Sequence, residues 1–200
     1  MTERVVIMKI NLSLCLILAA LPFSSSFAQV QSVTPSEVTD KTATQYKTVQ
    51  VLDGKASIAL PAGFEKMSAQ QITTRYATAN PQPKEVWYID TGKSVVSLAF
   101  SMPYPGKTLI DEHVPKLAAM VEKQMAAQKP VLTTKKVNGH TVSRLESAGK
   151  DVSGDGTTVH SIIQLSSFED QLLMTTFHVS SQLKDKYYPV GEAALNSLKY

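Results

Sequence analysis

From Lys47 onward, apolar and polar residues alternate with a period of two over most of the chain, which is the pattern of half-buried β-strands. The clearest example is the stretch 96–101, in which large apolar residues alternate with small ones. Two stretches, 108–128 and 181–198, instead repeat apolar residues at helical spacing. Pro115 lies inside the first of them, and it should kink that helix or mark its true start. The pattern therefore predicts two main helices among many strands.

Short turns join the expected strands. Asp53-Gly54 predicts a two-residue hairpin turn, and Asn138-Gly139 and Glu169-Asp170 predict two more turns later in the chain. The resulting order is a hairpin, two strands, a helix, a four-strand meander and a closing helix. Consecutive strands joined by short turns form antiparallel sheets. We therefore expect an α+β fold, in which an antiparallel β-sheet is packed with two main α-helices.

Residues 1–28 have the features of a cleaved secretory signal peptide. Arg4 and Lys9 precede an almost wholly apolar run from Ile10 to Phe23. This run is shorter than the roughly 20 residues that a membrane-spanning helix needs, and it fits the apolar region of a signal peptide. Ser26-Phe27-Ala28 supplies the pattern of small residues at a cleavage site. We expect cleavage after residue 28 and a mature protein in the periplasm, in contact with the membrane only during export.

The rest of the chain is expected to hold a flexible leader, 29–46, and a single domain, 47–200. Met1 and Met8 both fit as the start of the signal. Cys15 follows a large leucine in the middle of the apolar run, a position that argues against a lipid-attachment site. Since no other cysteine is present, the mature domain has neither disulfides nor cysteine ligands.

The charge of the chain is close to balanced. The formal net charge is +3, and it becomes +2 when Arg4, Lys9 and Glu3 leave with the signal peptide. No long cluster of lysine and arginine stands out, as a surface that binds nucleic acid would require. We therefore expect a protein partner, another periplasmic or envelope protein, rather than nucleic acid.

Several segments resemble the PsbP-like fold, and in particular the bacterial DcrB-like family. They are Gly63-Phe64 shortly after Leu60-Pro61, the mid-chain helix, the turn 137–140 and the ending 195–199. The resemblance covers roughly 47–200. It implies an accessory or binding protein rather than an enzyme, and it implies no cofactor and no catalytic residues.

The chain contains no recognisable catalytic motif, such as a nucleophile elbow, a His-Glu-x-x-His zinc motif or a glycine-rich phosphate loop. The loop Asp151–Gly156 has some of the acidic and glycine positions of a calcium loop. Position 12 of that loop would be Ile162, where calcium needs a bidentate glutamate. We therefore interpret the loop as a hairpin connection.

His160 and His178 are the candidate metal-binding residues. Suppose that the odd-numbered apolar residues of the last two strands share one face. In one register that allows this, the residue numbers of each opposed pair add to 338, and His160 then lies directly opposite His178. Such a pair could bind a metal, with Glu146 or His140 as a further ligand, or respond to pH. The same pattern also fits an alternative, in which the two histidines are ordinary polar residues on a solvated face and bind no metal.

The leading hypothesis is an exported, non-enzymatic accessory or protein-binding domain, whose sheet or sheet edge engages another envelope protein. A specific version is an immunity protein that neutralises a secreted antibacterial effector. Two alternatives belong to other classes: a metal-dependent hydrolase built around His160 and His178, and a carrier of a small ligand or lipid in a cavity between helix and sheet.

Overall fold

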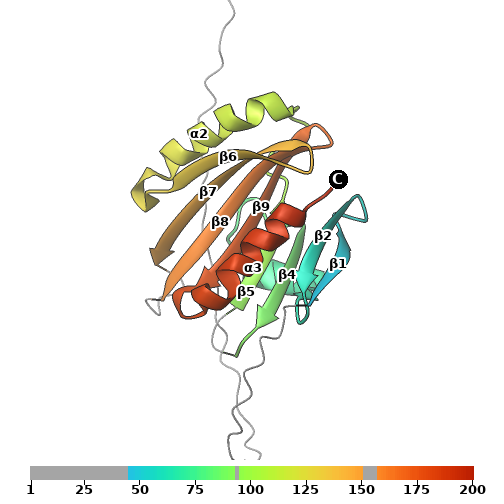
Figure 1. The fold of residues 1–200 in the computed structure, drawn as a ribbon, viewed down its shortest axis with the longest axis vertical. Coiled ribbons are helices and arrows are strands. Elements are labelled where there is room, and N and C mark those ends of the chain that lie inside the picture. Colours follow the sequence, from blue (N-terminus) through green and yellow to red (C-terminus); the bar gives the residue numbers. More distant parts are fainter. Residues whose placement is uncertain (1–44, 93–94, 151–156) are drawn as a thin grey trace, which may run out of the picture.

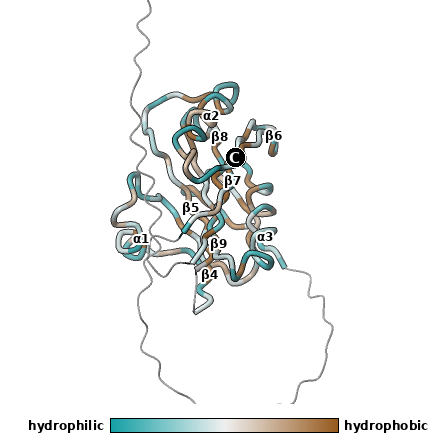
Figure 2. The backbone as a smooth tube through the Cα atoms, turned by 90° about the vertical axis from the view of Figure 1, so that its left-hand side faces the viewer, coloured by the Kyte–Doolittle hydropathy of each residue, from teal (hydrophilic) through white to brown (hydrophobic). Residues whose placement is uncertain are grey.

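The computed structural model describes residues 45–92, 95–150 and 157–200. Its middle layer is a seven-stranded antiparallel sheet in the order β3-β4-β5-β9-β8-β7-β6, and β1 and β2 form a separate two-stranded sheet. The helix α3 lies on one face of the large sheet, and α1 and α2 lie on the other (Figures 1 and 2). The strands are β1 (Tyr46–Val51), β2 (Ala56–Pro61), β3 (Glu65–Lys66), β4 (Glu85–Asp90), β5 (Val95–Ser101), β6 (Val131–Val137), β7 (His140–Lys150), β8 (Thr158–Phe168) and β9 (Gln171–Ser180). The helices are α1 (Ala69–Arg75), α2 (Val114–Gln124) and α3 (Lys184–Ser197), with short 3-10 turns η1 (Asp111–His113), η2 (Ala126–Gln128) and η3 (Ser181–Leu183).

The predicted α+β class, with an antiparallel sheet and helices packed on it, is confirmed. The four-strand meander runs from β6 to β9, as the turns at 138–139 and 169–170 predicted. The predicted signal peptide, the leader up to residue 44 and the loop 151–156 lie outside the described residues. Within the described residues, no helix is both long and apolar enough to cross a membrane.

One local prediction is wrong, and a second, which left two roles open for Pro115, is confirmed in one of its two forms. The first hairpin closes with Val51 opposite Ala56, so its turn contains four residues rather than the two of Asp53-Gly54. The mid-chain helix does not begin at Thr108. The turn η1 begins three residues later, and α2 begins at Val114, immediately before Pro115. The proline therefore occupies the first turn, where its missing N–H costs nothing.

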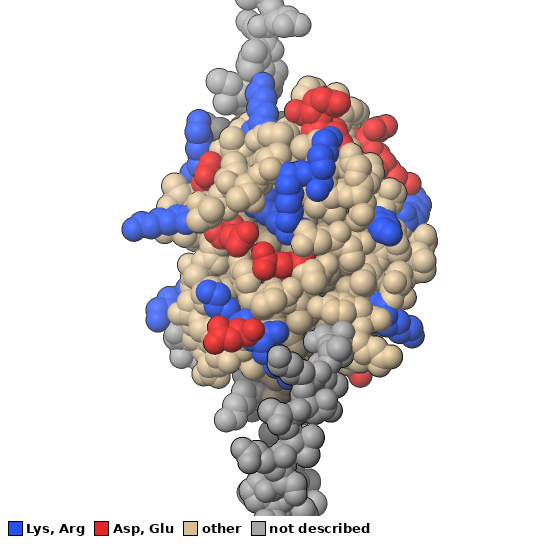
Figure 3. All heavy atoms as spheres, viewed as in Figure 1, with Lys and Arg blue, Asp and Glu red and all other residues tan. Residues whose placement is uncertain are grey.

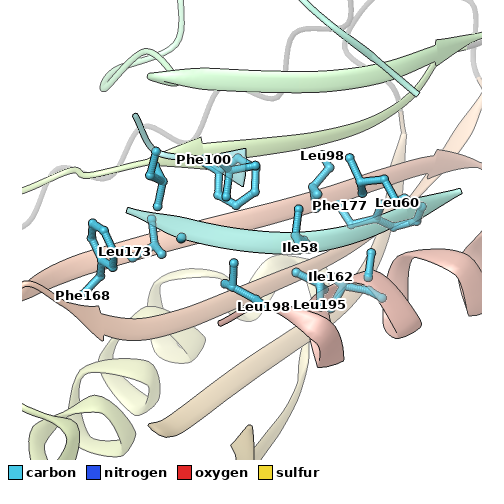
Figure 4. Packing of buried hydrophobic residues seen from close by; sticks show 14 of the residues in the cluster. Ile58, Leu60, Leu98, Phe100, Ile162, Phe168, Leu173, Phe177, Leu195 and Leu198 are labelled. Carbon is cyan, nitrogen blue, oxygen red and sulfur yellow. The ribbon is translucent and has the colours of Figure 1, made fainter. Parts of the chain in front are cut away.

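The face of the sheet toward α3 holds the largest hydrophobic cluster. Figure 4 shows Ile58 and Leu60 of β2 among side chains of the sheet and of α3. This face of the large sheet is thus covered jointly by the two-stranded sheet and by α3. The cluster consists of Val51, Leu52, Ala56, Ile58, Leu60, Val96, Leu98, Phe100, Ile162, Phe168, Leu173, Phe177, Val179, Ala194, Leu195 and Leu198.

The opposite face carries two smaller clusters, one under each helix. The helix α2 buries Val114, Ala118 and Val121 against β7, β8 and β9. The helix α1 is short and buries Ile72 near Val86 and Ala99 of β4 and β5. Both faces of the central strands are therefore buried.

Glu85 fixes the first hairpin to the large sheet. Its side chain is buried, yet Oε2 accepts the backbone N–H of Leu52 at 3.0 Å and Oε1 accepts Trp87 Nε1 at 2.7 Å. The ammonium of Lys66 lies 3.2 Å from Oε1. Leu52 has a φ of 53°, so the carboxylate holds a turn residue in the left-handed region.

We expect Glu85→Ala to lower the free energy of unfolding by about 2 kcal/mol, because the buried N–H of Leu52 and the indole N–H of Trp87 lose their acceptor. Urea unfolding followed by circular dichroism measures this change. The matched control is Glu65→Ala, which removes an exposed carboxylate from the neighbouring strand β3 and should change stability by less than about 0.5 kcal/mol. Equal effects of the two substitutions would contradict the role assigned to Glu85.

Candidate functional site

The structure separates the two histidines that the sequence paired. In the β8–β9 ladder, Ser161 lies opposite His178, and Val179 lies opposite His160. The partner numbers therefore add to 339 and not to the predicted 338. Directly opposed side chains share a face and neighbours alternate, so His160 and His178 point to opposite faces. The predicted histidine pair is wrong.

Burial on both faces explains this error. Ile162 of β8 packs with Phe177 of β9 on the side of α3, whereas Ile163 packs with Met174 on the side of α2. Strands that are buried on both faces carry apolar residues at odd and even positions alike. Their hydrophobic pattern therefore does not define a register, and only a solvated face would have done so.

His178 lies in a buried row of polar side chains. It is 7% exposed and is flanked in register by Ser97 of β5 and Ser161 of β8, both also buried. The Ser161 Oγ lies 2.9 Å from His178 Nδ1. Burial lowers the pKa of His178 to about 4, so its imidazole is neutral at pH 7. A histidine with this pKa is a weak proton acceptor at neutral pH, which favours a hydrogen-bonded structural pair over a catalytic one.

His160 lies on the face of α3, at the margin of that helix. Its Nε2 is 3.0 Å from Ser181 Oγ, and its ring meets the edge of Tyr188 at a centroid distance of 6.3 Å. Burial lowers the pKa of His160, and the positive charge of Lys184 lowers it further. Through these contacts, His160 packs against α3 and the turn η3 that precedes it.

The two further predicted ligands also lie apart. His140 Nδ1 is 3.6 Å from Asp111 Oδ2, and its ring packs on Tyr200 at a centroid distance of 4.5 Å. Glu146 accepts a hydrogen bond from the Tyr188 hydroxyl. Among the residues that the structure describes, no three His, Cys, Asp or Glu side chains gather in a way that could hold a metal ion.

Charged and polar side chains do gather between α3 and the edge of the sheet at β6. Figure 3 shows Lys or Arg beside Asp or Glu in the middle of this face, which is the face that α3 crosses in Figure 1. We call this surface the α3–β6 patch. It consists of Lys135 of β6, Arg144 and Glu146 of β7, and Tyr188, Glu192 and Asn196 of α3.

Arg144 forms the base of the patch. It is only 2% exposed, and its guanidinium is held by two neutral amides. Nε donates to Gln164 Oε1 at 2.8 Å, and Nη2 donates to Asn196 Oδ1 at 3.0 Å. Burial lowers the pKa of Arg144, whereas the charges of Glu192 and Glu146 raise it. Arginine stays protonated in proteins, so a permanent positive charge is fixed beneath α3.

Tyr188 and Glu146 form the opposite side of the patch. The hydroxyl of Tyr188 donates to Glu146 Oε2. Burial raises the pKa of Tyr188, and the hydrogen bond to Glu146 and the charges of Glu146 and Glu192 raise it further. The tyrosine therefore remains a protonated donor, and the patch offers fixed charges of both signs together with an aromatic ring.

Sequence reasoning missed this patch, although two signals for it were present. Tyr188, Glu192 and Asn196 follow one another at intervals of four, which places them on one face of a helix. Arg144 is a charged residue in a long strand of a sheet that was expected to be covered by helices. A buried charge in such a strand must find partners, which is a reason to look for polar residues nearby.

Comparisons with known proteins bear on the fold alone. A scan against models of protein families finds no match for this sequence. A search of curated proteins also finds no significant match.

Several solved structures are similar. A protein of Bacteroides thetaiotaomicron has 9% identity and a TM-score of 0.49, with 76% of this chain aligned to 47% of that one. The cyanobacterial PsbP of Synechocystis sp. PCC 6803 has 12% identity and a TM-score of 0.49, with coverage of 82% and 97%. The Ran-binding protein Mog1p of Saccharomyces cerevisiae has 10% identity and a TM-score of 0.44, with coverage of 78% and 96%.

One of these proteins is a PsbP, the fold family that the sequence resembles, whereas the DcrB-like assignment stays a prediction. The chain spans about half the length of the first of the three structures, 47%. Similarity at this level carries no functional assignment.

Proposed function

We propose that this protein is an exported, non-enzymatic domain that binds another protein of the cell envelope through the α3–β6 patch. The observation that carries the proposal is the patch itself: a tyrosine and an arginine fixed by hydrogen bonds, with carboxylates and a lysine beside them. Tyrosine is enriched among the residues that dominate binding energy at protein interfaces, and Tyr188 is half-buried. Arg144 lies beneath the surface and holds the exposed Asn196 in place.

The chemistry of the patch favours a protein partner over a reaction. Its positive and negative charges alternate over a short distance, which gives specificity for one complementary surface and little attraction for a polyanion. Its tyrosine is held protonated and its arginine is permanently charged, so neither is poised to exchange a proton near pH 7. The Ser161–His178 contact lies on the other face of the sheet and does not contribute to the patch.

Site-specific cross-linking in intact cells tests this proposal. A photo-reactive amino acid at Thr133, which lies opposite Arg144 on the exposed edge strand, should cross-link to one defined protein in the periplasmic fraction. The matched control is the same amino acid at the exposed Lys123 of α2, on the other face of the sheet, which should give no such product. Charge reversal by Glu192→Lys should reduce the Thr133 product at least about tenfold, because a complementary charge becomes a repulsive one.

Equal cross-linking from both positions, or a product that Glu192→Lys leaves unchanged, would show that the patch is not the interface. The identity of the product also separates the two versions of the proposal. A secreted antibacterial effector as the cross-linked protein would support an immunity role, and a resident envelope protein would support an accessory role. Recovery of the chain only from the cytoplasm would contradict export.

A further inference from the structure

Among the residues that the structure describes, the outer edge of β6 has no neighbouring strand. β6 is the last strand of the seven-stranded sheet, and it pairs with β7 alone (Figure 1). Its residues 133–136 are all exposed, and Val131 is 62% exposed although it is apolar. The helix α2 packs on side chains of β7, β8 and β9, so it covers a face of the sheet and leaves this edge accessible.

The turn that follows β6 determines which backbone groups point outward. Val137 lies opposite His140, and Asn138 and Gly139 between them have φ values of 48° and 94°. A two-residue turn of this type is closed by a hydrogen-bonded pair, and such pairs alternate with non-hydrogen-bonded ones along an antiparallel ladder. The odd-numbered residues of β6 therefore bond to β7. The even-numbered residues direct their N–H and C=O groups outward, and they are Leu132, Thr134 and Lys136.

Two side-chain contacts agree with this assignment. Thr134 Oγ1 lies 2.8 Å from Ser143 Oγ, and Lys136 Nζ donates to Thr141 Oγ1 at 2.7 Å. Each contact joins residues that are directly opposite in the β6–β7 ladder. Side chains approach most closely in non-hydrogen-bonded pairs, so the backbone groups of Thr134 and Lys136 do not bond to β7.

The shape of β6 allows another strand to pair with it. It has seven residues and pairs with β7 residue for residue from Val131 to Val137, and no proline interrupts it. Proteins protect edge strands by short length, proline, bulges or lysine. At the other end of the sheet, β3 has only two residues. Of these devices β6 has lysine alone, at Lys135 and Lys136.

The charge at this edge selects the strand that can be added. From residue 129 to residue 145 the chain carries Lys129, Lys135, Lys136 and Arg144 and no acidic residue. Neighbouring side chains on a strand point to opposite faces, so the two lysines of β6 flank its edge on both sides. Within the described part of the chain, neither lysine takes part in an ion pair. A second copy of β6 would bring the same lysines to this edge and be repelled, whereas an acidic strand is attracted.

We propose that the outer edge of β6 binds an extended acidic segment of the protein partner as an additional strand of the large sheet. The inference rests on the proposed function and gives its mode of binding. Backbone hydrogen bonds to the outward groups hold the segment, and a carboxylate opposite Lys136 selects it. Lys136 lies on the face of α2, so Glu146 and Glu192 on the face of α3 do not oppose that carboxylate.

The exposed side chains of β6 define a probe peptide. In antiparallel pairing, the residues opposite Lys136, Lys135 and finally Val131 follow one another along the peptide. A capped peptide with two glutamates, two threonines and two valines in this order places acids opposite the lysines and an apolar side chain opposite Val131. Its first threonine then lies opposite Thr134 and its second opposite Thr133.

Amide NMR of the full chain with and without this peptide tests the edge. At saturation the N–H groups of Leu132, Thr134 and Lys136 should exchange with solvent at least about tenfold more slowly, because each gains an acceptor. Those of Thr133 and Lys135 should not change, because they already bond to β7. A peptide with lysines in place of the glutamates should bind at least about tenfold more weakly.

A pair of N-methylated peptides tests the backbone contacts and leaves the protein unchanged. Methylation of the first threonine removes an N–H that points at β6, and it should weaken binding at least about tenfold. Methylation of the second threonine is the matched control. Its N–H points away from β6, so the affinity should stay the same.

A charge reversal on the protein tests the selection. Lys136→Glu should reverse the preference, so that the lysine peptide binds more tightly than the glutamate peptide. The matched control is Lys123→Glu at an exposed position of α2, which should leave the preference as it is.

Strand addition is overturned if the two N-methylated peptides bind equally well, if the amides of Leu132, Thr134 and Lys136 gain no protection, or if Lys136→Glu keeps the original preference. A cross-link from Thr133 in cells together with any of these results would leave the proposed function standing. Protection of the three amides without a cross-linked partner would instead support the edge as a binding strand and overturn the proposed function.

Discussion

Gly191→Ala should lower the free energy of unfolding by at least about 3 kcal/mol. Gly191 lies in the middle of α3, where it faces β9. A Cβ added at this position would come within 2.3 to 2.6 Å of three ring atoms of Phe177. Phe177 is itself 1% exposed, so its ring has nowhere to move without displacing other core residues.

The sign of this effect makes the prediction specific. In an exposed helix, replacing glycine by alanine stabilises by about 1 kcal/mol, because alanine has the better helix propensity. A strong loss of stability can therefore arise only from the close approach of α3 to the sheet. Urea unfolding of the wild type and the variant measures it.

Two further variants serve as controls. Gly149→Ala places the same Cβ on β7, where nothing lies within 4 Å, and it should change stability by less than about 0.5 kcal/mol. In a Phe177→Ala background, Gly191→Ala should cost less than about 1 kcal/mol, because the Cγ and ring atoms that the new Cβ meets are gone. A stabilising effect of Gly191→Ala in the wild type would mean that α3 does not pack against β9 as closely as the structure shows.

The second large effect concerns His178 and pH. We expect the protein to lose about 3 kcal/mol of stability through this residue as the pH falls from 7 to 4. Burial lowers the pKa of His178 in the folded state from 6.5 to about 4. Between these two values the unfolded chain binds the proton and the folded protein does not, so acid favours unfolding. The contribution is complete above the unfolded pKa and is lost as the pH approaches the folded one.

Comparison with His178→Gln isolates this contribution from the other titrating groups. The difference in unfolding free energy between wild type and variant should be constant above pH 7 and should change by about 3 kcal/mol in favour of the variant toward pH 4. Urea unfolding over this pH range measures it, and NMR titration of the His178 ring gives the folded pKa directly. A titration midpoint near 6.5 would contradict the burial of the ring.

Ser161→Ala tests the cause of the depressed pKa. It removes the hydroxyl 2.9 Å from Nδ1 but keeps the residue in the sheet. Since burial is what lowers the pKa of His178, the ring of this variant should still titrate far below 6.5. A return to an ordinary value would mean that the Ser161 contact, and not desolvation, keeps the ring neutral.

The features that the sequence predicted correctly depend on local chemistry. The turn at Asn138-Gly139 needs positive φ values, and these residues adopt them at 48° and 94°. The strands β6 to β9 follow from their patterns and from the turns between them. The start of α2 at Val114 agrees with one of the two roles expected for Pro115, since proline fits the first turn of a helix.

The predictions that failed depended on contacts between distant segments. The four-residue turn of the first hairpin includes Leu52, whose N–H is held by Glu85, 33 positions away in the chain. The pairing of His160 with His178 failed because two helices and a hairpin cover both faces of β8 and β9. The α3–β6 patch joins β6, β7 and α3, and no local pattern brings Lys135 and Arg144 to the same oxygen of Asn196.

The sequence by itself determined the α+β class and the order of most elements, because hydrophobic periodicity and turn residues act over a few neighbouring positions. The tertiary structure alone decided the β8–β9 register, the neutral state of His178 and the convergence of two cations beneath α3. Register and burial are set by which surfaces cover the sheet, and that is a property of the packed layers and not of any one segment.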